Sequence, residues 1–277
     1  MIEFLHYEFV WRALAASILG GITCGIVGVW VVLLNIPFVG VAMSHSAFAG
    51  AVFGLLFGIN PLISALVSCL LSALLIGPVA DRGDFSPNVS IGIIFSFVLG
   101  VAFLGMGFLK GQKIEALNLL WGSILTISRQ EIFFLAIITV LILVLLAALY
   151  RQIMAVLFNR EIAKASGVPE KAIFYLLLFM CGAVVTLNLN TIGGLLVFSL
   201  VTSSPLAAYQ ITYDLKKMYI FSAIFGVTSC LAGFIFSYIL NVPSGAAIII
   251  VSSLIFVTCM IFSRKRRKIN HEPQTVF

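Results

Sequence analysis

Charge is scarce in this sequence. Only 9% of its 277 residues are Asp, Glu, Lys or Arg, whereas 62% are hydrophobic. An ordinary soluble domain is about 45–50% apolar and about 25% charged. So little polar surface cannot cover a soluble globule, which excludes a cytosolic enzyme, a nucleic-acid-binding domain, a disordered chain and a secreted disulfide scaffold. The composition indicates an integral membrane protein built from spans of about 20 apolar residues each.

Acidic residues are missing from the interior of the apolar runs. The ten Asp and Glu residues lie at the ends of these runs, in the breaks between them or in the tail. Proton- and voltage-driven carriers usually place ionisable groups at mid-membrane, so this absence argues against a proton-coupled secondary transporter. The sequence also lacks a GxxxxGK[ST] phosphate-binding loop. We therefore expect no enzyme activity in this chain: if transport uses ATP, another chain must hydrolyse it.

Cysteines are few and scattered. The five cysteines lie in apolar segments, and none forms a CxxC pair. This pattern favours small buried hydrophobic side chains over disulfides or a thiolate metal site. The first residues lack the positive charge and the cleavage pattern of a signal peptide, so the first apolar segment is expected to remain as a span.

Apolar runs separated by polar breaks fill most of the chain. The breaks carry turn-forming residues, such as Asn35-Ile36-Pro37 and Asn60-Pro61. The pattern predicts an all-α, polytopic transmembrane bundle of about 8–9 spans in a single domain over 1–277, and a mixed stretch at 117–126 indicates a short interfacial or re-entrant helix. The runs lie at 11–34, 39–58, 61–80, 89–109, 130–150, 171–190, 191–209, 217–240 and 244–263.

Basic residues indicate the orientation. A tail at 264–277 begins with five consecutive Lys or Arg residues, directly after the last apolar run. Because cytoplasmic loops are enriched in Lys and Arg, this placement favours a cytoplasmic tail over a nucleic-acid-binding segment. With nine spans, the breaks near 35–38, 81–88, 151–170 and 210–216 are then also cytoplasmic. That side would hold 12 of the 16 basic residues, and the N-terminus would lie outside.

The break at 151–170 contains a short helix, predicted at 158–167. Asn159 suits its N-cap, Glu161 its first turn and Gly167 the position after its end, and Pro169 prevents continuation. A capped helix of two turns is more than a connection between spans needs. Two interpretations remain open: a helix that docks a cytoplasmic partner, or an interfacial helix without a partner.

The second apolar run carries a ladder of small residues and one histidine. Small residues at every fourth position allow close approach of another helix. His45 is the one histidine inside an apolar run. Intramembrane ionisable residues are often functional and imidazole binds zinc, copper and iron; a structural histidine bonded to a backbone carbonyl is the alternative. The ladder consists of Ala42, Ser46, Gly50, Gly54 and Gly58.

A proline lies late in the run at 191–209. Pro205 follows Thr202-Ser203-Ser204. Proline leaves a helix carbonyl without its amide partner, and nearby hydroxyls can satisfy that carbonyl. A kinked span of this kind suits a gate or the wall of a cavity; a kink with a purely structural role is the alternative.

Six segments together resemble the integral membrane permeases of ABC transporters for zinc, manganese and iron uptake. The resemblance runs from about 10 to 263, in the same order. It rests on SHSAFAG at 44–50, NVSIGIIFS at 88–96, LWGSIL at 120–125, FNREIAKASGVP at 158–169, IGGLLVFSLVTSSPLAA at 192–208, and DLKKM at 214–218 followed by a Pro-Ser-Gly break at 243–245.

The resemblance implies a homodimer of permeases around a central pathway in the lipid of a prokaryotic plasma membrane. It also implies a cytosolic ATP-binding subunit and an extracytoplasmic metal-binding protein. Within this chain, His45 is expected to touch the transported ion. The expected pathway or gate residues are Val41, Ser44, Ser203, Ser204 and Pro205. The expected ATPase-coupling residues are Phe158, Asn159, Arg160, Glu161, Ala163, Ala165 and Gly167.

One departure from the family pattern concerns the metal. Many members of the family that this chain resembles carry Asp-x-x-x-His on the second span. In this chain, Val41 occupies the position of that Asp. A lone imidazole lacks the oxygen ligand that manganese prefers, so zinc is favoured slightly over manganese and iron. No cofactor is expected to be bound by the chain itself.

The sequence therefore predicts the membrane-spanning permease subunit of an ABC importer for zinc, manganese or iron. A secondary carrier for a small solute, driven by an ion gradient, is the alternative, and it would work without any ATPase. A membrane scaffold or enzyme subunit would require a cofactor-binding or acid–base group in the spans, and the sequence shows none.

Overall fold

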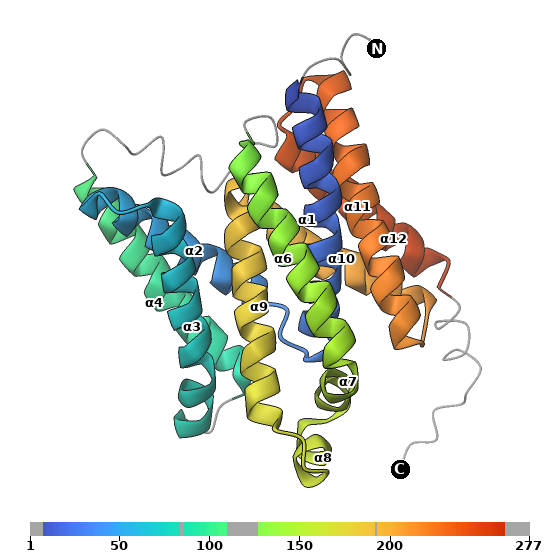
Figure 1. Cartoon of the computed structure of the whole chain (residues 1–277). Coiled ribbons are helices and arrows are strands. Elements are labelled where there is room, and N and C mark those ends of the chain that lie inside the picture. The colour runs from blue at the N-terminus through green and yellow to red at the C-terminus, as the bar shows by residue number, and fades with distance from the viewer. Residues whose placement is uncertain (1–7, 84–85, 110–126, 192, 264–277) are drawn as a thin grey trace.

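The computed structural model describes residues 8–83, 86–109, 127–191 and 193–263. Within these ranges every regular element is a helix (Figure 1). The helix expected at 117–126 lies outside the described residues. The helices are α1 Glu8–Leu33, α2 Val39–Phe57, α3 Pro61–Gly83, α4 Pro87–Phe108, α6 Arg129–Ala148, α7 Tyr150–Phe158, α8 Arg160–Ala165, α9 Glu170–Thr191, α10 Gly194–Ile211, α11 Leu215–Leu240 and α12 Ser244–Ile261.

The described helices account for the expected spans. Eight of them are long and apolar enough to cross a membrane, and the apolar part of α10, Leu196–Ile211, is shorter. A helix satisfies its own backbone hydrogen bonds, which the hydrocarbon of a bilayer cannot do. The prediction of an all-α bundle of about 8–9 spans is therefore confirmed.

Helices α1 and α2 are the most buried of the long helices, followed by α9. Their most apolar stretches are 72%, 72% and 61% buried, against 22% in α6 and α12. Helix α1 packs mainly on α11 and α10, and α2 packs mainly on α3 and α4. Figure 1 shows α2, α3 and α4 on one side of the molecule, α1, α11 and α12 on the other, and α6 and α9 between them. Each half of the bundle is thus built around one deeply buried helix.

Glycines let α1 and α11 touch backbone to backbone. A Cβ added to Gly25 would lie 2.7 Å from the carbonyl oxygen of Ser222. The Ser222 Oγ donates a hydrogen bond to the Gly25 carbonyl at 2.7 Å, and Trp30 Nε1 donates to the Tyr219 hydroxyl at 2.9 Å. Close approach through small residues and hydrogen bonds between helices are the usual means of association in a bilayer.

The small residues of α2 serve packing, with one exception. A Cβ on Gly50 would lie 2.6 Å from the Cβ of Ser68, and a Cβ on Gly54 would lie 3.0 Å from the Cα of Pro61. These contacts confirm that the ladder brings α3 close. Gly58 does not belong to it: this residue ends α2 with a φ of 67°, and no atom lies within 4 Å of where its Cβ would be.

The breaks expected in the cytoplasm lie together at one end of the bundle, hereafter the basic end. There Asn88 donates to the carbonyl of Asn35 at 2.7 Å, and the Ser263 hydroxyl donates to the carbonyl of Gln210 at 2.9 Å. Helices α7 and α8 lie at the same end (Figure 1). The starts of α1 and α6 lie at the opposite end, where Glu8 pairs with an arginine of each. The breaks that were expected to share one side thus lie at one end, and which end is cytoplasmic stays a prediction.

Candidate functional site

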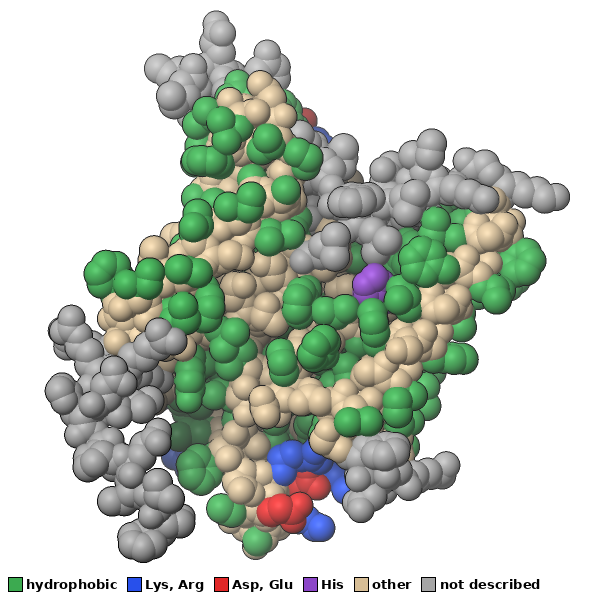
Figure 2. Space-filling model, turned by 180° about the vertical axis from the view of Figure 1, so that it is seen from behind, with side chains coloured by type: hydrophobic (Ala, Val, Ile, Leu, Met, Phe, Trp, Pro, Cys, Tyr) green, Lys and Arg blue, Asp and Glu red, His purple; other side chains and the backbone are tan. Residues whose placement is uncertain are grey.

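His45 lies midway along α2, on the side that faces α4. Its ring contacts the ring of Phe95 edge-on, with centroids 5.2 Å apart. The side chain is half-buried, and Figure 2 shows it at the molecular surface among hydrophobic side chains. Its Nδ1 atom is buried and has no hydrogen-bond partner among the described residues. A histidine tied through Nδ1 to a backbone carbonyl is therefore not what the structure shows, and this buried nitrogen keeps its hydrogen-bonding capacity unused among the described residues.

The neighbours of His45 on α2 have different roles. Ser44 is buried, and its hydroxyl lies 2.8 Å from the carbonyl of Gly40 and 3.2 Å from that of Gly194, so it fastens α2 to the start of α10. Val41, one turn before His45, is half-buried and apolar. Among the described residues, no three His, Cys, Asp or Glu side chains lie close enough to hold a metal ion together. The described part of the chain thus offers an ion one imidazole.

The expected gate residues at 203–205 lie on α10, far from His45. Ser44 meets α10 at Gly194, and Ser204 follows ten residues later, which is about 15 Å along a helix axis. The structure does not bring the gate residues and the histidine into one site. Their assignment to the pathway or gate stays a prediction.

Pro205 lies inside the continuous helix α10 and is packed against α1. A Cβ on Gly28 would lie 2.9 Å from the Cγ of Pro205 and would overlap the carbonyl of Val201. That carbonyl lies four residues before the proline, which has no amide hydrogen to offer it. Ser204 is buried, and its hydroxyl has no hydrogen-bond partner among the described residues. Gly28 gives the freed carbonyl and the proline ring their space, so Pro205 takes part in the packing of α10 on α1.

The predicted helix between the fifth and sixth long spans is present as α8. The Asn159 side chain caps it, accepting from the amides of Glu161 at 2.9 Å and Ile162 at 3.1 Å. Gly167 follows its end with a φ of 79°. The cap and the terminator are thus confirmed. Helix α7, which follows α6 after a break at Leu149, was not expected.

The segment at 158–167 has an inner and an outer face. Ala163 is buried against the protein, whereas Ala165 is exposed. Phe158 and Ile162 are 83% and 55% exposed. Exposed large apolar side chains grouped at one place often mark an interaction surface. The outer face is therefore free to contact another molecule.

An ion pair joins the start of α8 to the start of α9. Arg160 lies with Nη2 at 2.8 Å and Nε at 3.1 Å from Oε2 of Glu170. The same guanidinium lies 4.1 Å from the centre of the Phe174 ring. Arg160 is one of the expected ATPase-coupling residues, and its head group is turned toward α9; its coupling role stays a prediction.

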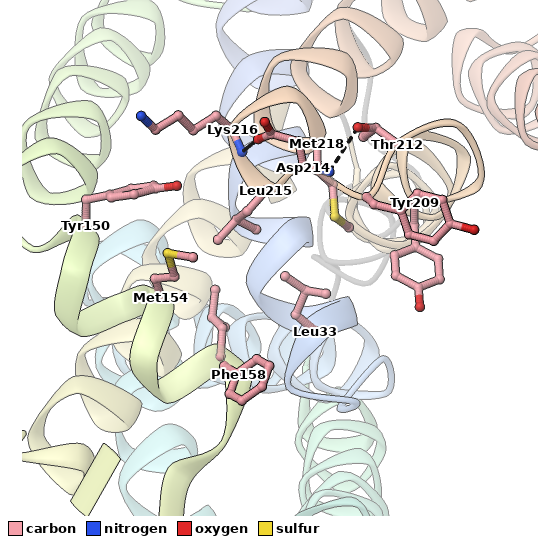
Figure 3. Close-up of a pocket in the computed structure, with 12 residues that line it drawn as sticks. Leu33, Tyr150, Met154, Phe158, Tyr209, Thr212, Asp214, Leu215, Lys216 and Met218 are labelled. Atoms are coloured by element: carbon pink, nitrogen blue, oxygen red, sulfur yellow. Dashed lines mark hydrogen bonds between the residues drawn. The ribbon is translucent and has the colours of Figure 1, made fainter. Parts of the chain in front are cut away.

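A cavity of about 900 Å³ opens beside the segment at 158–167, at the basic end. Figure 3 shows side chains from α7 facing the end of α1 and the connection between α10 and α11. Asp214 caps α11 there by accepting from the amide of Lys216 at 2.8 Å. Phe158 lines this cavity and is also exposed, so the cavity continues the exposed face of the segment at 158–167. Its aromatic and apolar lining includes Leu33, Tyr150, Met154, Phe158, Tyr209 and Tyr213.

Sequence reasoning missed three residues of these sites. Phe95 contacts His45 from another helix, and Glu170 and Phe174 hold Arg160. The spacing of residues within one helix does not predict these contacts, because each of them joins two different helices. The available signal for Glu170 was its position, since it is an acid at the first residue of a span that follows a basic loop.

The described residues form a bundle of apolar helices with His45 within it and a capped helix at its basic end, which is the architecture of a multi-pass membrane protein. Comparison with known proteins identifies the family of this chain, because the profile of the ABC 3 transport family matches residues 6–263. The chain belongs to this family. It is a multi-pass permease of the prokaryotic plasma membrane.

Relatives of similar length support this assignment. A manganese transport system membrane protein MntC from Halalkalibacterium halodurans is 31% identical over 95% of this chain and 90% of its own. The manganese import system permease protein ScaB from Streptococcus parasanguinis is 27% identical over 96% of this chain and 95% of its own. The solved structure of PsaBC from Streptococcus pneumoniae in complex with Fab matches with a TM-score of 0.85 and 26% identity, covering 96% of each chain.

Proposed function

We propose that this chain is the permease subunit of an ABC importer that moves a divalent transition metal ion into the cell. The observation that supports this most directly is His45: an imidazole inside a span, with a buried nitrogen that has no hydrogen-bond partner among the described residues. In a family of ABC permeases, a ligand group in the membrane marks the route of the transported substrate. The whole chain, 1–277, forms one permease domain with its basic tail in the cytoplasm.

Manganese is the first candidate for the transported ion. The relatives from Halalkalibacterium and Streptococcus carry manganese transport in their names. Zinc is the second candidate, because Val41 leaves the His45 face of α2 without a carboxylate, and an imidazole alone suits zinc better than manganese. Iron is the third.

Three partners complete the proposed importer. A cytosolic ATPase docks on the exposed face around Phe158 and Ile162, next to the cavity at the basic end. A second copy of the chain forms the homodimer and adds a second His45 to the pathway, which compensates for a site of one imidazole. An extracytoplasmic binding protein delivers the ion to the opposite end, where α1 and α6 begin.

Metal analysis of cells tests this proposal. Cells lacking the gene are grown in metal-depleted medium and complemented with the wild type, with His45→Ala, or with His271→Ala as a control that removes a histidine of the tail. We expect a selective fall in cellular manganese that the wild type and His271→Ala restore and His45→Ala does not.

The outcomes separate the parts of the proposal. A fall in zinc alone would identify zinc as the substrate. Full restoration by His45→Ala would retain the importer and reject His45 as a ligand. Unchanged content of every metal would reject metal import.

A further inference from the structure

Helix α8 is held to α9 by a contact that faces away from the proposed ATPase surface. The Glu170 side chain is only 9% exposed, and the Arg160 side chain is 35% exposed. Both nitrogens of Arg160 that face Glu170 bind the same carboxylate oxygen, and the guanidinium also lies over the Phe174 ring. A charge-assisted bond to a mostly buried carboxylate is stronger than an exposed surface pair. We call these three residues the α8–α9 clamp.

The rest of the segment is held by the buried side chain of Ala163 and by local hydrogen bonds. Helix α8 has six residues, which is too short to be stable on its own in water. It is closed by the Asn159 cap, by Gly167 with its positive φ and by a bond from the Val168 amide to the carbonyl of Ala163 at 3.0 Å. These bonds shape the turn but stay within it. Among the interactions described, the clamp is what ties the first residue of α8 to the first turns of a span.

Helix α9 continues from the clamp to the level of His45. Gly182 lies twelve residues after Glu170, or about 18 Å along the axis. A Cβ on Gly182 would lie 3.1 Å from Cys69 Sγ and 3.7 Å from the sulfur of Met43. Cys69 Sγ in turn lies 3.5 Å from the carbonyls of both Met43 and Gly182. Met43 is two residues from His45 on α2. Helix α9 therefore packs against the segment of α2 that carries the imidazole.

We propose that the α8–α9 clamp is the positioning element that makes α8 and α9 move as one body, so that a displacement of α8 by the ATPase reaches α2 at His45. This inference rests on the proposed function and deepens it. Arg160, Glu170 and Phe174 do not touch the ion; they act through α9. Without the clamp, α8 can move with the ATPase while α9 stays in place, and ATP is hydrolysed without transport.

The test is the number of manganese ions transported per ATP hydrolysed. The full chain is purified with its ATPase, reconstituted in liposomes and supplied with its metal-binding protein. The variants are Arg160→Ala, Glu170→Gln and the double variant, with Lys217→Ala as a control that removes an exposed basic charge at the same end. We expect each single variant to lower the ratio at least about fivefold while ATP hydrolysis continues, the double variant to lose no more than the worse single one, and the control to match the wild type.

Several results would overturn the clamp. An unchanged ratio in both single variants would do so, and so would parallel losses of hydrolysis and transport, which would make the ion pair merely structural. If Glu170→Gln fails to fold, Phe174→Leu carries the test: it keeps the ion pair and an apolar side chain but removes the ring face, and an unchanged ratio there would also contradict the clamp. A wild-type complex that hydrolyses ATP but moves no metal would instead refute the proposed function.

Discussion

Replacing Gly25 with alanine tests the contact between α1 and α11. The new Cβ would lie 2.7 Å from the carbonyl oxygen of Ser222, 2.8 Å from its carbonyl carbon and 2.9 Å from the Cα of Ala223. All three atoms belong to the backbone, so no side-chain rotation relieves the overlap. The two helices must move apart by several tenths of an ångström or more, which also lengthens the 2.7 Å bond from Ser222 to Gly25.

The expected cost follows from these two effects. Overpacking of a close contact costs about 1–3 kcal/mol, and loss of a hydrogen bond between membrane helices adds about 0.6 kcal/mol. For a chain of this size, each kcal/mol corresponds to roughly 2–4 °C in melting temperature. We therefore expect Gly25→Ala to lower the apparent Tm by several degrees.

Thermal unfolding of the purified chain in detergent measures this shift. Gly100→Ala is the matched control, because Gly100 is also inside a helix but has no atom within 4 Å of its added Cβ. The control should keep or slightly raise the Tm, since alanine favours helix over glycine by about 1 kcal/mol. Equal Tm values for the two variants would refute the proposed close packing of α1 on α11.

Two further predictions concern single hydrogen-bonding groups. Asn159→Ala removes the cap of α8, which is worth about 1 kcal/mol. Amide hydrogen exchange at 160–165 should therefore accelerate, while exchange in α9 stays the same. Unchanged exchange at 160–165 would show that the cap is dispensable. Trp30→Phe removes the donor to the buried Tyr219 hydroxyl. This should lower the free energy of unfolding by about 1–3 kcal/mol, which is measured as a lower Tm. Adding Tyr219→Phe to Trp30→Phe should lower the Tm little further, and a fully additive loss would contradict direct coupling of the pair.

Local sequence signals predicted the helices and the caps. The Asn and Pro residues of the breaks separated the spans, and Asn159 and Gly167 defined α8, because these features depend on a few neighbouring residues. The small residues of α2 likewise predicted close packing. Gly21-x-x-x-Gly25 on α1 is the same kind of signal, and the structure shows that it marks the crossing with α11.

Contacts between distant segments were beyond local signals. The sequence did not predict that the Arg160 head group turns to Glu170 ten residues later, because that direction depends on how α9 leaves the turn. Phe95 meets His45 only because α4 folds back beside α2. The separation of Ser204 from His45 follows from the point at which α10 crosses α2. Such positions are set by the packing of whole helices.

Uptake of radioactive manganese into cells tests the central claim most directly. Cells lacking the gene are complemented with the wild type or with His45→Ala, and uptake is followed with a proton ionophore added while cellular ATP is maintained. The account predicts ATP-dependent uptake that requires this chain and His45 and that survives loss of the proton gradient. Uptake that the ionophore abolishes at unchanged ATP, or that proceeds without this chain, would contradict it.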